Sequence, residues 1–195
     1  MHSLSLFRGL GVFVREEFLA QTVCRALCTQ MRAATARPAE VLGTSSAAVD
    51  RVIRRTSDAQ IDGAAADDAR VRIEALSLPL ASHFRIDLGA CEDISFLVYG
   101  VGDFYRPHRD RAARAGDFVE GARSRRVSVV LFLNDGYSGG ALTLYGLVDD
   151  PKTRAHGFAI PPAPGLLIAF ASDLVHEVTP VTAGERFTAV NWFHG

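Results

Sequence analysis

The segment YGVGDFYRPHRD, residues 99–110, decides how this sequence can fold. Its glycines separate an apolar run that ends at Tyr99 from a second run, Phe104–His108, which continues towards Asp110. Side chains two residues apart on a β-strand point to the same face. His108 and Asp110 are therefore predicted to project an imidazole and a carboxylate towards one point, as two ligands of a metal ion would.

A third ligand of suitable type lies far downstream, in the apolar run Leu174-Val-His-Glu-Val. A sheet that folds back on itself can bring His176 beside the first pair, whereas Glu177 is expected on the opposite, solvated face of its strand. Two histidines and one carboxylate on one side of a metal leave the remaining positions open, which is typical of non-haem iron(II) oxygenases. The sequence thus predicts an iron site.

A buried cation is expected near that metal. A 2-oxo acid can chelate a metal through its keto oxygen and adjacent carboxylate, and its far carboxylate then needs a cationic partner, for which the planar fork of arginine is best suited. Arg186 begins the last apolar run, just beyond the Thr182-Ala-Gly184 turn. Antiparallel pairing across this turn would place the Arg186 guanidinium near the metal-bound ligand.

The second half of the chain consists of short β-branched and aromatic runs, separated by Asp-Gly, Gly-Gly and proline-rich turn signals. Eight such runs with regular turns predict a β-sandwich or jelly roll. The runs are Ile94–Tyr99, Phe104–His108, Arg126–Leu133, Ala141–Tyr145, Gly157–Ile160, Gly165–Phe170, Val175–Thr179 and Arg186–Phe193.

The first half has helical spacing instead. Apolar residues at three- and four-residue steps predict one amphipathic helix over 16–34 and a second over 69–83, with Pro79 as a weak point. Alternation predicts a strand over 49–55, and 57–68 is expected to be a loop. The expected fold class is mainly β with supporting helices (α+β). Residues 1–91 form a support region on one sheet, and 92–195 form the jelly-roll domain of one integrated unit.

The composition is that of an ordinary globular protein. The 195 residues suffice for one domain with a sizeable core, and 48% are apolar and 22% charged. A formal net charge of −1 gives no reason to expect a nucleic-acid or membrane partner, and no apolar run has the length of a membrane span. Residues 1–18 lack the pattern of a signal peptide, and three cysteines indicate no disulfide framework, so a cytoplasmic location is expected.

These blocks occur in an order that is similar to a known family. Residues 92–193 resemble the catalytic domain of the iron(II)/2-oxoglutarate-dependent dioxygenase superfamily, in its prolyl 4-hydroxylase-like branch. An isolated His-x-Asp motif is weak because it occurs often by chance, but the ordered set is specific. The set comprises the Tyr-Gly lead-in to His108-x-Asp110, Arg126 through Leu133-Asn134, Gly139-Gly140, Pro164-Gly165, Phe170 through His176, Val181 to Arg186, and Trp192.

The resemblance implies a double-stranded β-helix (jelly roll) in which His108, Asp110 and His176 bind Fe(II). It also implies that Arg186 pairs with the distal carboxylate of the co-substrate 2-oxoglutarate and that the Tyr99 hydroxyl helps to bind it. The implied reaction consumes O2, converts 2-oxoglutarate to succinate and carbon dioxide, and hydroxylates an unactivated C–H bond. By the same analogy, L-ascorbate rescues over-oxidised iron.

One residue departs from the family pattern. Many relatives have a tyrosine at the position of Phe132, where its hydroxyl binds the distal carboxylate, and phenylalanine cannot donate a hydrogen bond. Thr188 lies two residues after Arg186, hence on the same strand face, and is a candidate replacement. An ordinary strand residue at this position is the alternative.

No residue identifies the substrate. Hydroxylation of a prolyl or similar residue in a peptide or protein is favoured, a free amino acid or small metabolite is the rival, and a non-catalytic jelly-roll binding module is the alternative outside the enzymes. Nucleic acid is not expected, because Trp192 stands where demethylating relatives carry a second arginine. Tyr105 and Arg126 are candidate substrate-binding residues. The arginine-rich segment 110–126 is either a lid over the site or a solvated loop.

Overall fold

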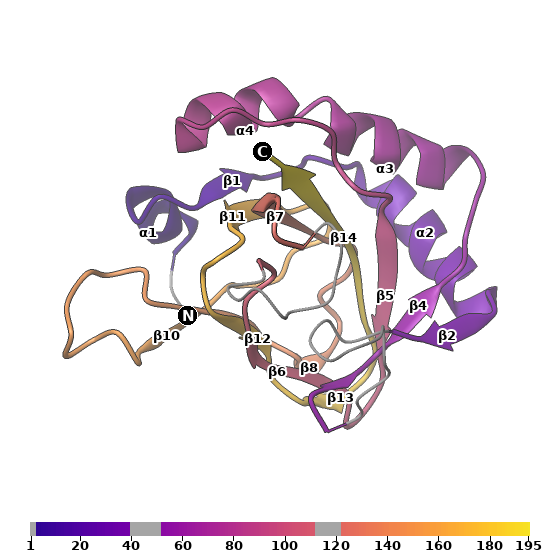
Figure 1. Ribbon diagram of the computed structural model, residues 1–195. Coiled ribbons are helices and arrows are strands. Elements are labelled where there is room, and N and C mark those ends of the chain that lie inside the picture. Colours follow the sequence, from indigo (N-terminus) through magenta and orange to yellow (C-terminus); the bar gives the residue numbers. More distant parts are fainter. Residues whose placement is uncertain (1–2, 40–51, 112–121) are drawn as a thin grey trace.

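Two antiparallel sheets enclose the interior of the protein in a computed structural model, which describes residues 3–39, 52–111 and 122–195 (Figure 1). The larger sheet has the order β1 (Phe13–Arg15), β11 (Leu167–Ala171), β7 (Arg125–Phe132), β14 (Arg186–His194), β5 (Ser95–Tyr99), β4 (Ser57–Ala59) and β2 (Ala36–Pro38). The smaller sheet has the order β10 (Gly157–Ala159), β9 (Leu142–Tyr145), β12 (His176–Val178), β6 (Phe104–His108) and β3 (Arg54–Arg55). A short pair, β13 (Val181–Ala183) and β8 (Ser138–Gly139), accompanies them.

The predicted jelly roll is confirmed. Each of the eight runs expected to be strands forms one, with boundaries shifted by up to a few residues. These strands are β5, β6, β7, β9, β10, β11, β12 and β14. Because side chains alternate along a strand, the central strand β7 contributes to two apolar layers, one on each face of the larger sheet. Val127, Val129 and Leu131 pack towards the helices, while Val130 and Phe132 pack into the interior between the sheets.

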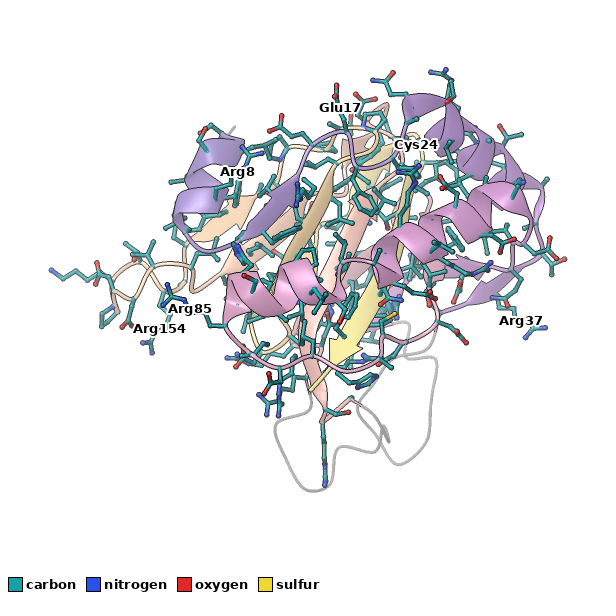
Figure 2. All side chains as sticks on the ribbon, turned by 90° about the horizontal axis from the view of Figure 1, so that it is seen from above. Arg8, Glu17, Cys24, Arg37, Arg85 and Arg154 are labelled. Carbon is teal, nitrogen blue, oxygen red and sulfur yellow. The ribbon has the colours of Figure 1, made fainter. Side chains whose placement is uncertain are left out.

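Three helices cover the outer face of the larger sheet, where Figure 1 shows them on one side of the strands. They are α2 (Gln21–Ala33), α3 (Ala64–Glu74) and α4 (Ser77–Phe84). In the view of Figure 2, α3 and α4 lie in front of the strands. Helix α2 buries Cys24, Leu27, Cys28 and Met31, whose spacing places them on one stripe. The helices thus fill the outer core, and the interior between the sheets is left for a site.

The first predicted helix begins later than expected, at Gln21 instead of Glu16. The preceding residues are held by the sheet, because the Phe18 amide donates to the Gly165 carbonyl (2.8 Å) and β1 pairs with β11 as the edge strand of the sheet. A short helix, α1 (Leu4–Gly9), precedes β1. Elements this short have no periodic pattern in the sequence. Strand β1 forms because it can pair with β11, which is distant in the sequence.

The second predicted helix is broken in two, and the expected loop over 57–68 is wrong. This loop region contains β4 and the first residues of α3, which begins at Ala64. The break before Ser77 places Pro79 in the first turn of α4, where its missing N–H is not needed. Of the strand predicted over 49–55, Arg54–Arg55 forms β3, while 49–51 lie outside the described residues. No helix of the described ranges has the length and hydrophobicity of a membrane span.

A tight turn at Gly165 generates a test of the packing between β11 and the start of α2. Gly165 has φ +83°, and a Cβ added there would lie 2.2 Å from the Leu19 carbonyl oxygen, whereas Gly146 has φ +71° and open space around it. We expect Gly146→Ala to lower the free energy of unfolding by about 1–2 kcal/mol through backbone strain alone. Gly165→Ala should lower it by about 2–5 kcal/mol because a clash is added. Denaturant unfolding measures both, and equal losses would contradict the packing.

Candidate metal and co-substrate site

Neighbouring antiparallel strands bring the two predicted histidine ligands together. His108 is the last residue of β6, His176 is the first residue of β12, and the two are direct partners in the register. Direct partners on antiparallel strands project to the same face. Their ring centroids accordingly lie 4.2 Å apart, although 67 residues separate them in the sequence.

Asp110 completes the cluster from just beyond β6, and not from the strand itself as the alternation assumed. Its backbone N–H and that of Arg111 both donate to the Ser172 carbonyl (2.9 Å each), which turns the carboxylate towards the histidines. Asp110 Oδ1 lies 3.5 Å from His108 Nε2, and Oδ2 lies 3.4 Å from His176 Nε2. Adjacent ligands of an octahedral ion with bonds of about 2.1 Å are about 3 Å apart. The donor set and its spacing therefore fit an ion such as Fe(II).

Backbone carbonyls fix both imidazoles with the same nitrogen facing the cluster. His108 Nδ1 is 2.9 Å from the Arg106 carbonyl oxygen, and His176 Nδ1 is 3.0 Å from the Leu174 carbonyl oxygen. A carbonyl can only accept, so each Nδ1 carries the proton and each Nε2 presents a lone pair. Burial also lowers the pKa of His176 to about 4, which keeps this ring neutral at physiological pH.

Two serines that the sequence analysis missed hold the Asp110 carboxylate. The Ser128 hydroxyl donates to Asp110 Oδ2 (2.7 Å), and the Ser172 hydroxyl lies 2.9 Å from Ser128 Oγ. Ser128 has one proton to give, so Ser172 donates to Ser128. Burial alone would raise the pKa of Asp110, but His176, His108 and the Ser128 bond together hold it well below its usual range. A lone polar residue on the inward face of the apolar strand β7 was the signal available for Ser128.

Aromatic rings set the planes of the imidazoles. Tyr105 stacks on His108, with ring centroids 3.4 Å apart and an interplanar angle of 16°. Phe170 meets His176 edge-on at 4.8 Å between centroids. Because both rings are packed from the side, their Nε2 atoms cannot swing away from Asp110 without disturbing the core.

One cavity of about 550 Å³ contains most of the predicted site. This volume is within the range of small-molecule sites. The cavity brings together all predicted residues except Arg126: His108, Asp110, His176, Arg186, Tyr99, Thr188 and Tyr105.

The Arg186 guanidinium is the buried cation that the sequence predicted. Arg186 is 1% exposed, and its Nη1 donates to Thr188 Oγ1 (3.2 Å), as expected for two residues on one strand face. The rings of Tyr99 and Phe132 lie 4.8 Å and 5.6 Å from its Cζ. Arg186 Nε has no hydrogen-bond partner in the part of the chain that the structure describes. An unpaired buried donor is costly, so this atom fits the carboxylate of a bound ligand.

Arg125 lines the cavity in place of Arg126. Strict alternation from Ser128 would turn Arg126 inwards, but the register of β14 on β7 shifts between Phe193 and His194, where His194 pairs with Arg125. Such an irregularity re-aims side chains. Arg125 lies over the Trp192 ring (4.0 Å from Cζ to the centroid) and forms a two-pronged ion pair with Glu92 (2.5 and 2.6 Å).

Glu177 and the segment 110–126 were also expected to have particular places around the site. Glu177 does face away from the cluster, but it is half-buried and accepts a hydrogen bond from the Tyr145 hydroxyl, so it is not simply solvated. The segment 110–126, expected to be either a lid or a solvated loop, falls mostly on residues 112–121, which lie outside the described residues.

Comparison with known sequences supports this geometry. Residues 94–194 match the sequence profile of the 2OG-Fe(II) oxygenase superfamily. A PKHD-type hydroxylase of Maricaulis maris is 30% identical over 155 residues, which cover 77% of this chain and 64% of the relative. A PKHD-type hydroxylase of Acaryochloris marina is 37% identical over 99 residues, 50% of this chain and 39% of the relative. The chain thus spans less than two thirds of the length of these relatives.

Solved structures share the fold over nearly the whole chain. A prolyl-4-hydroxylase of Pseudomonas putida has a TM-score of 0.74 and 27% identity, covering 97% of this chain and 95% of its own. A prolyl hydroxylase of Trichoplax adhaerens, solved with a peptide fragment of hypoxia inducible factor, has a TM-score of 0.72. Its 20% identity over 97% of this chain and 86% of its own shows similarity of fold alone.

The metal cluster predicts a specific loss of metal binding. Asp110→Ala should reduce bound Fe(II) from about one ion per chain to almost none, because two imidazoles without a carboxylate form a weak site. His108→Ala and His176→Ala should do the same. Asp173→Ala, which removes an exposed carboxylate near the site, is the control and should keep the ion. Anaerobic equilibrium dialysis measures the metal, and normal iron content in Asp110→Ala would refute the assignment.

The buried guanidinium predicts a loss of 2-oxoglutarate affinity. Arg186→Lys keeps the charge but loses the fork, so binding should weaken by about 1–3 kcal/mol. Arg186→Ala should be worse because a carboxylate would be buried unpaired. Arg85→Lys, at an exposed position, is the control. Calorimetry on the metal-loaded protein without oxygen gives the constants, and unchanged values in both Arg186 variants would exclude the assigned role.

Proposed function

Because the chain belongs to the 2OG-Fe(II) oxygenase superfamily, we propose that it is an iron(II)- and 2-oxoglutarate-dependent dioxygenase that hydroxylates an unactivated C–H bond. One observation carries this proposal. A single cavity holds two imidazoles and a carboxylate whose ligand atoms lie within 4.8 Å of one another, and the same cavity contains a buried guanidinium whose Nε has no partner among the described residues. Bound iron and 2-oxoglutarate would supply the oxidising chemistry, with release of succinate and carbon dioxide.

The residues of the chain divide the remaining work. His108, Asp110 and His176 would hold the metal, while Arg186, with Thr188 and the Tyr99 hydroxyl, would hold the distal carboxylate of the co-substrate. Apolar side chains line the wall between these two groups and would exclude water from the reacting centre. Among the apolar side chains that line this cavity are Val130, Leu142, Val178 and Val190.

The substrate we propose is a prolyl or similar residue within a peptide or protein. The solved Pseudomonas putida and Trichoplax adhaerens relatives are prolyl hydroxylases, and the latter holds a peptide. Arg125 provides support from this chain. It is buried, its charge is paired with Glu92, and its Nη1 has no partner among the described residues. An unpartnered Nη1 on a guanidinium whose charge is already neutralised suits the carbonyl oxygen of a peptide better than the carboxylate of a free amino acid.

A reductant and a cellular compartment are also part of the proposal. L-Ascorbate would serve as the reductant that rescues over-oxidised iron. The cytoplasm is the proposed compartment, because Cys24 and Cys28 are buried free thiols whose pKa burial raises to about 11, as befits inert core residues in a reducing environment.

Product analysis tests the proposal and separates the substrate classes. The protein is incubated with Fe(II), 2-oxoglutarate, ascorbate and either a panel of proline-containing peptides or free L-proline and other amino acids. We expect a peptide to gain one oxygen atom, about 16 Da, with succinate formed in step, and Asp110→Ala to abolish both. Turnover of free amino acids alone would replace the peptide with a small metabolite. Absence of succinate under every condition, substrate-free turnover included, would overturn the enzymatic function.

A further inference from the structure

Arg186 needs a fixed orientation that the residues lining the cavity supply only in part. Among the described residues that line the cavity, Thr188 alone accepts a hydrogen bond from its guanidinium, from Nη1 to Thr188 Oγ1. Tyr99 and Phe132 lie against it as rings, and the Phe132 side chain has no polar atom. A planar fork recognises a carboxylate through two parallel bonds, so its rotation about the side-chain axis matters for binding. A second contact with the guanidinium would therefore fix this rotation.

Tyr137 provides such a contact from outside the cavity. It lies in the segment between β7 and β8, it is half-buried, and it is not among the residues that line the cavity. Its phenol lies within hydrogen-bonding reach of the Arg186 side chain, next to which its ring packs at Gly140. Burial raises the pKa of this phenol, although the Arg186 charge opposes the change. A protonated phenol has lone pairs that accept from the guanidinium. Tyr137 thus contacts the same cation as Thr188.

Two glycines in left-handed conformations make room for this contact. Gly140 has φ +59°, and a Cβ there would lie 3.2 Å from Arg186 Cδ and 3.3 Å from Tyr137 Cε2. Gly184 has φ +74°, and a Cβ there would lie 3.3 Å from Tyr137 Cα and 3.0 Å from the Gly136 carbonyl oxygen. The backbone of Gly136 and Tyr137 therefore packs closely against the turn at Gly184 that leads into β14, and Gly140 leaves room for the Tyr137 ring beside Arg186. Larger residues at either glycine would disturb this packing.

Asn134 ties the beginning of the same segment to β14. Its Nδ2 donates to the Glu185 carbonyl (2.8 Å), and its Oδ1 accepts from the Phe187 N–H (2.9 Å). These bonds fix the backbone on either side of Arg186. The segment 134–140 is thereby held at its start by Asn134 and at its end by Gly140, with Tyr137 between them and directed to the guanidinium.

We propose that Tyr137 is a positioning residue for the co-substrate anchor, and that it provides Arg186 with the hydroxyl contact that Phe132 does not supply within the cavity. Tyr137 and Thr188 together set the rotation of the Arg186 fork and so the affinity for the distal carboxylate. The inference rests on the proposed binding of 2-oxoglutarate and adds a residue to it. It predicts that Tyr137 affects only ligands that carry a distal carboxylate.

The test compares two ligands that chelate the metal in the same way. 2-Oxoglutarate carries a distal carboxylate, whereas 2-oxopentanoate has the same 2-oxo acid group and an apolar end. Dissociation constants are measured by calorimetry, without oxygen, on the Fe(II)-loaded parent, Tyr137→Phe, Thr188→Val and the double variant. Tyr145→Phe is the matched control, because it removes the hydroxyl that contacts Glu177 and not Arg186.

We expect Tyr137→Phe to weaken 2-oxoglutarate binding about tenfold, as for loss of one hydrogen bond to a charged group, and to leave 2-oxopentanoate binding unchanged. The two substitutions should be non-additive in the double variant, because both residues orient one guanidinium. With saturating 2-oxoglutarate, the kcat of Tyr137→Phe for succinate formation should equal that of the parent. Tyr145→Phe should change neither constant.

Three outcomes would overturn the inference: unchanged 2-oxoglutarate affinity in Tyr137→Phe, an equal loss for both ligands, or strict additivity with Thr188→Val. An equal loss would assign Tyr137 a merely structural part, and the thermal midpoint of the ligand-free protein would fall with it. Failure of the parent itself to bind 2-oxoglutarate is a different result, because it refutes the proposed function.

Discussion

Arg186 and Asp110 are charged side chains buried in the same apolar interior, at 1% and 6% exposure. An unpaired buried charge costs several kcal/mol, so each must be compensated or the fold is destabilised. Asp110 has the Ser128 hydroxyl and two imidazoles, and Arg186 has the Thr188 hydroxyl, the Tyr137 phenol and two aromatic rings. The described residues compensate the charge of Arg186 only in part, since Arg186 Nε finds no acceptor among them. A bound cation beside the carboxylate and a bound anion beside the guanidinium would complete both.

The two-sheet architecture is what allows such groups to coexist with a core. The side chains of β7, β11 and β14 that point outwards form the apolar layer under α2, α3 and α4, which supplies much of the hydrophobic burial. Those that point inwards include Ser128, Arg186 and Thr188, which can be polar because the outer layer is separately packed. Stability and chemistry are thus assigned to opposite faces of the same strands, and a single-residue slip in register would exchange them.

The sequence predicted the parts of this arrangement that depend on local pattern. The eight strands follow from β-branched runs and turn residues, and alternation correctly placed Arg186 and Thr188 on one face. The meeting of His108 with His176 could be inferred from ligand chemistry, and the register provides it. These predictions needed only the period of a strand and the preferences of a metal.

The remaining features depend on contacts between distant segments, which no local pattern encodes. Arg125 replaces Arg126 in the cavity because the register shifts at the end of β14. The short strand β1 depends on its pairing with β11. The helix break before Ser77 places Pro79 in the first turn of α4, where its backbone nitrogen needs no hydrogen-bond acceptor. Tyr137 was missed for the same reason, since only the folded turns at Gly140 and Gly184 bring it to Arg186.

Optical titration tests the central claim most directly, namely that one cavity binds iron and a 2-oxo dicarboxylate together. Iron(II) is added to the protein without oxygen, followed by 2-oxoglutarate, and the visible absorption of the metal chelate is recorded. The structure predicts a weak charge-transfer band that saturates at one equivalent per chain and does not form when Asp110 is replaced by alanine. Iron binding without any band, at every concentration of 2-oxoglutarate, would show that the buried arginine and the metal cluster do not serve one ligand.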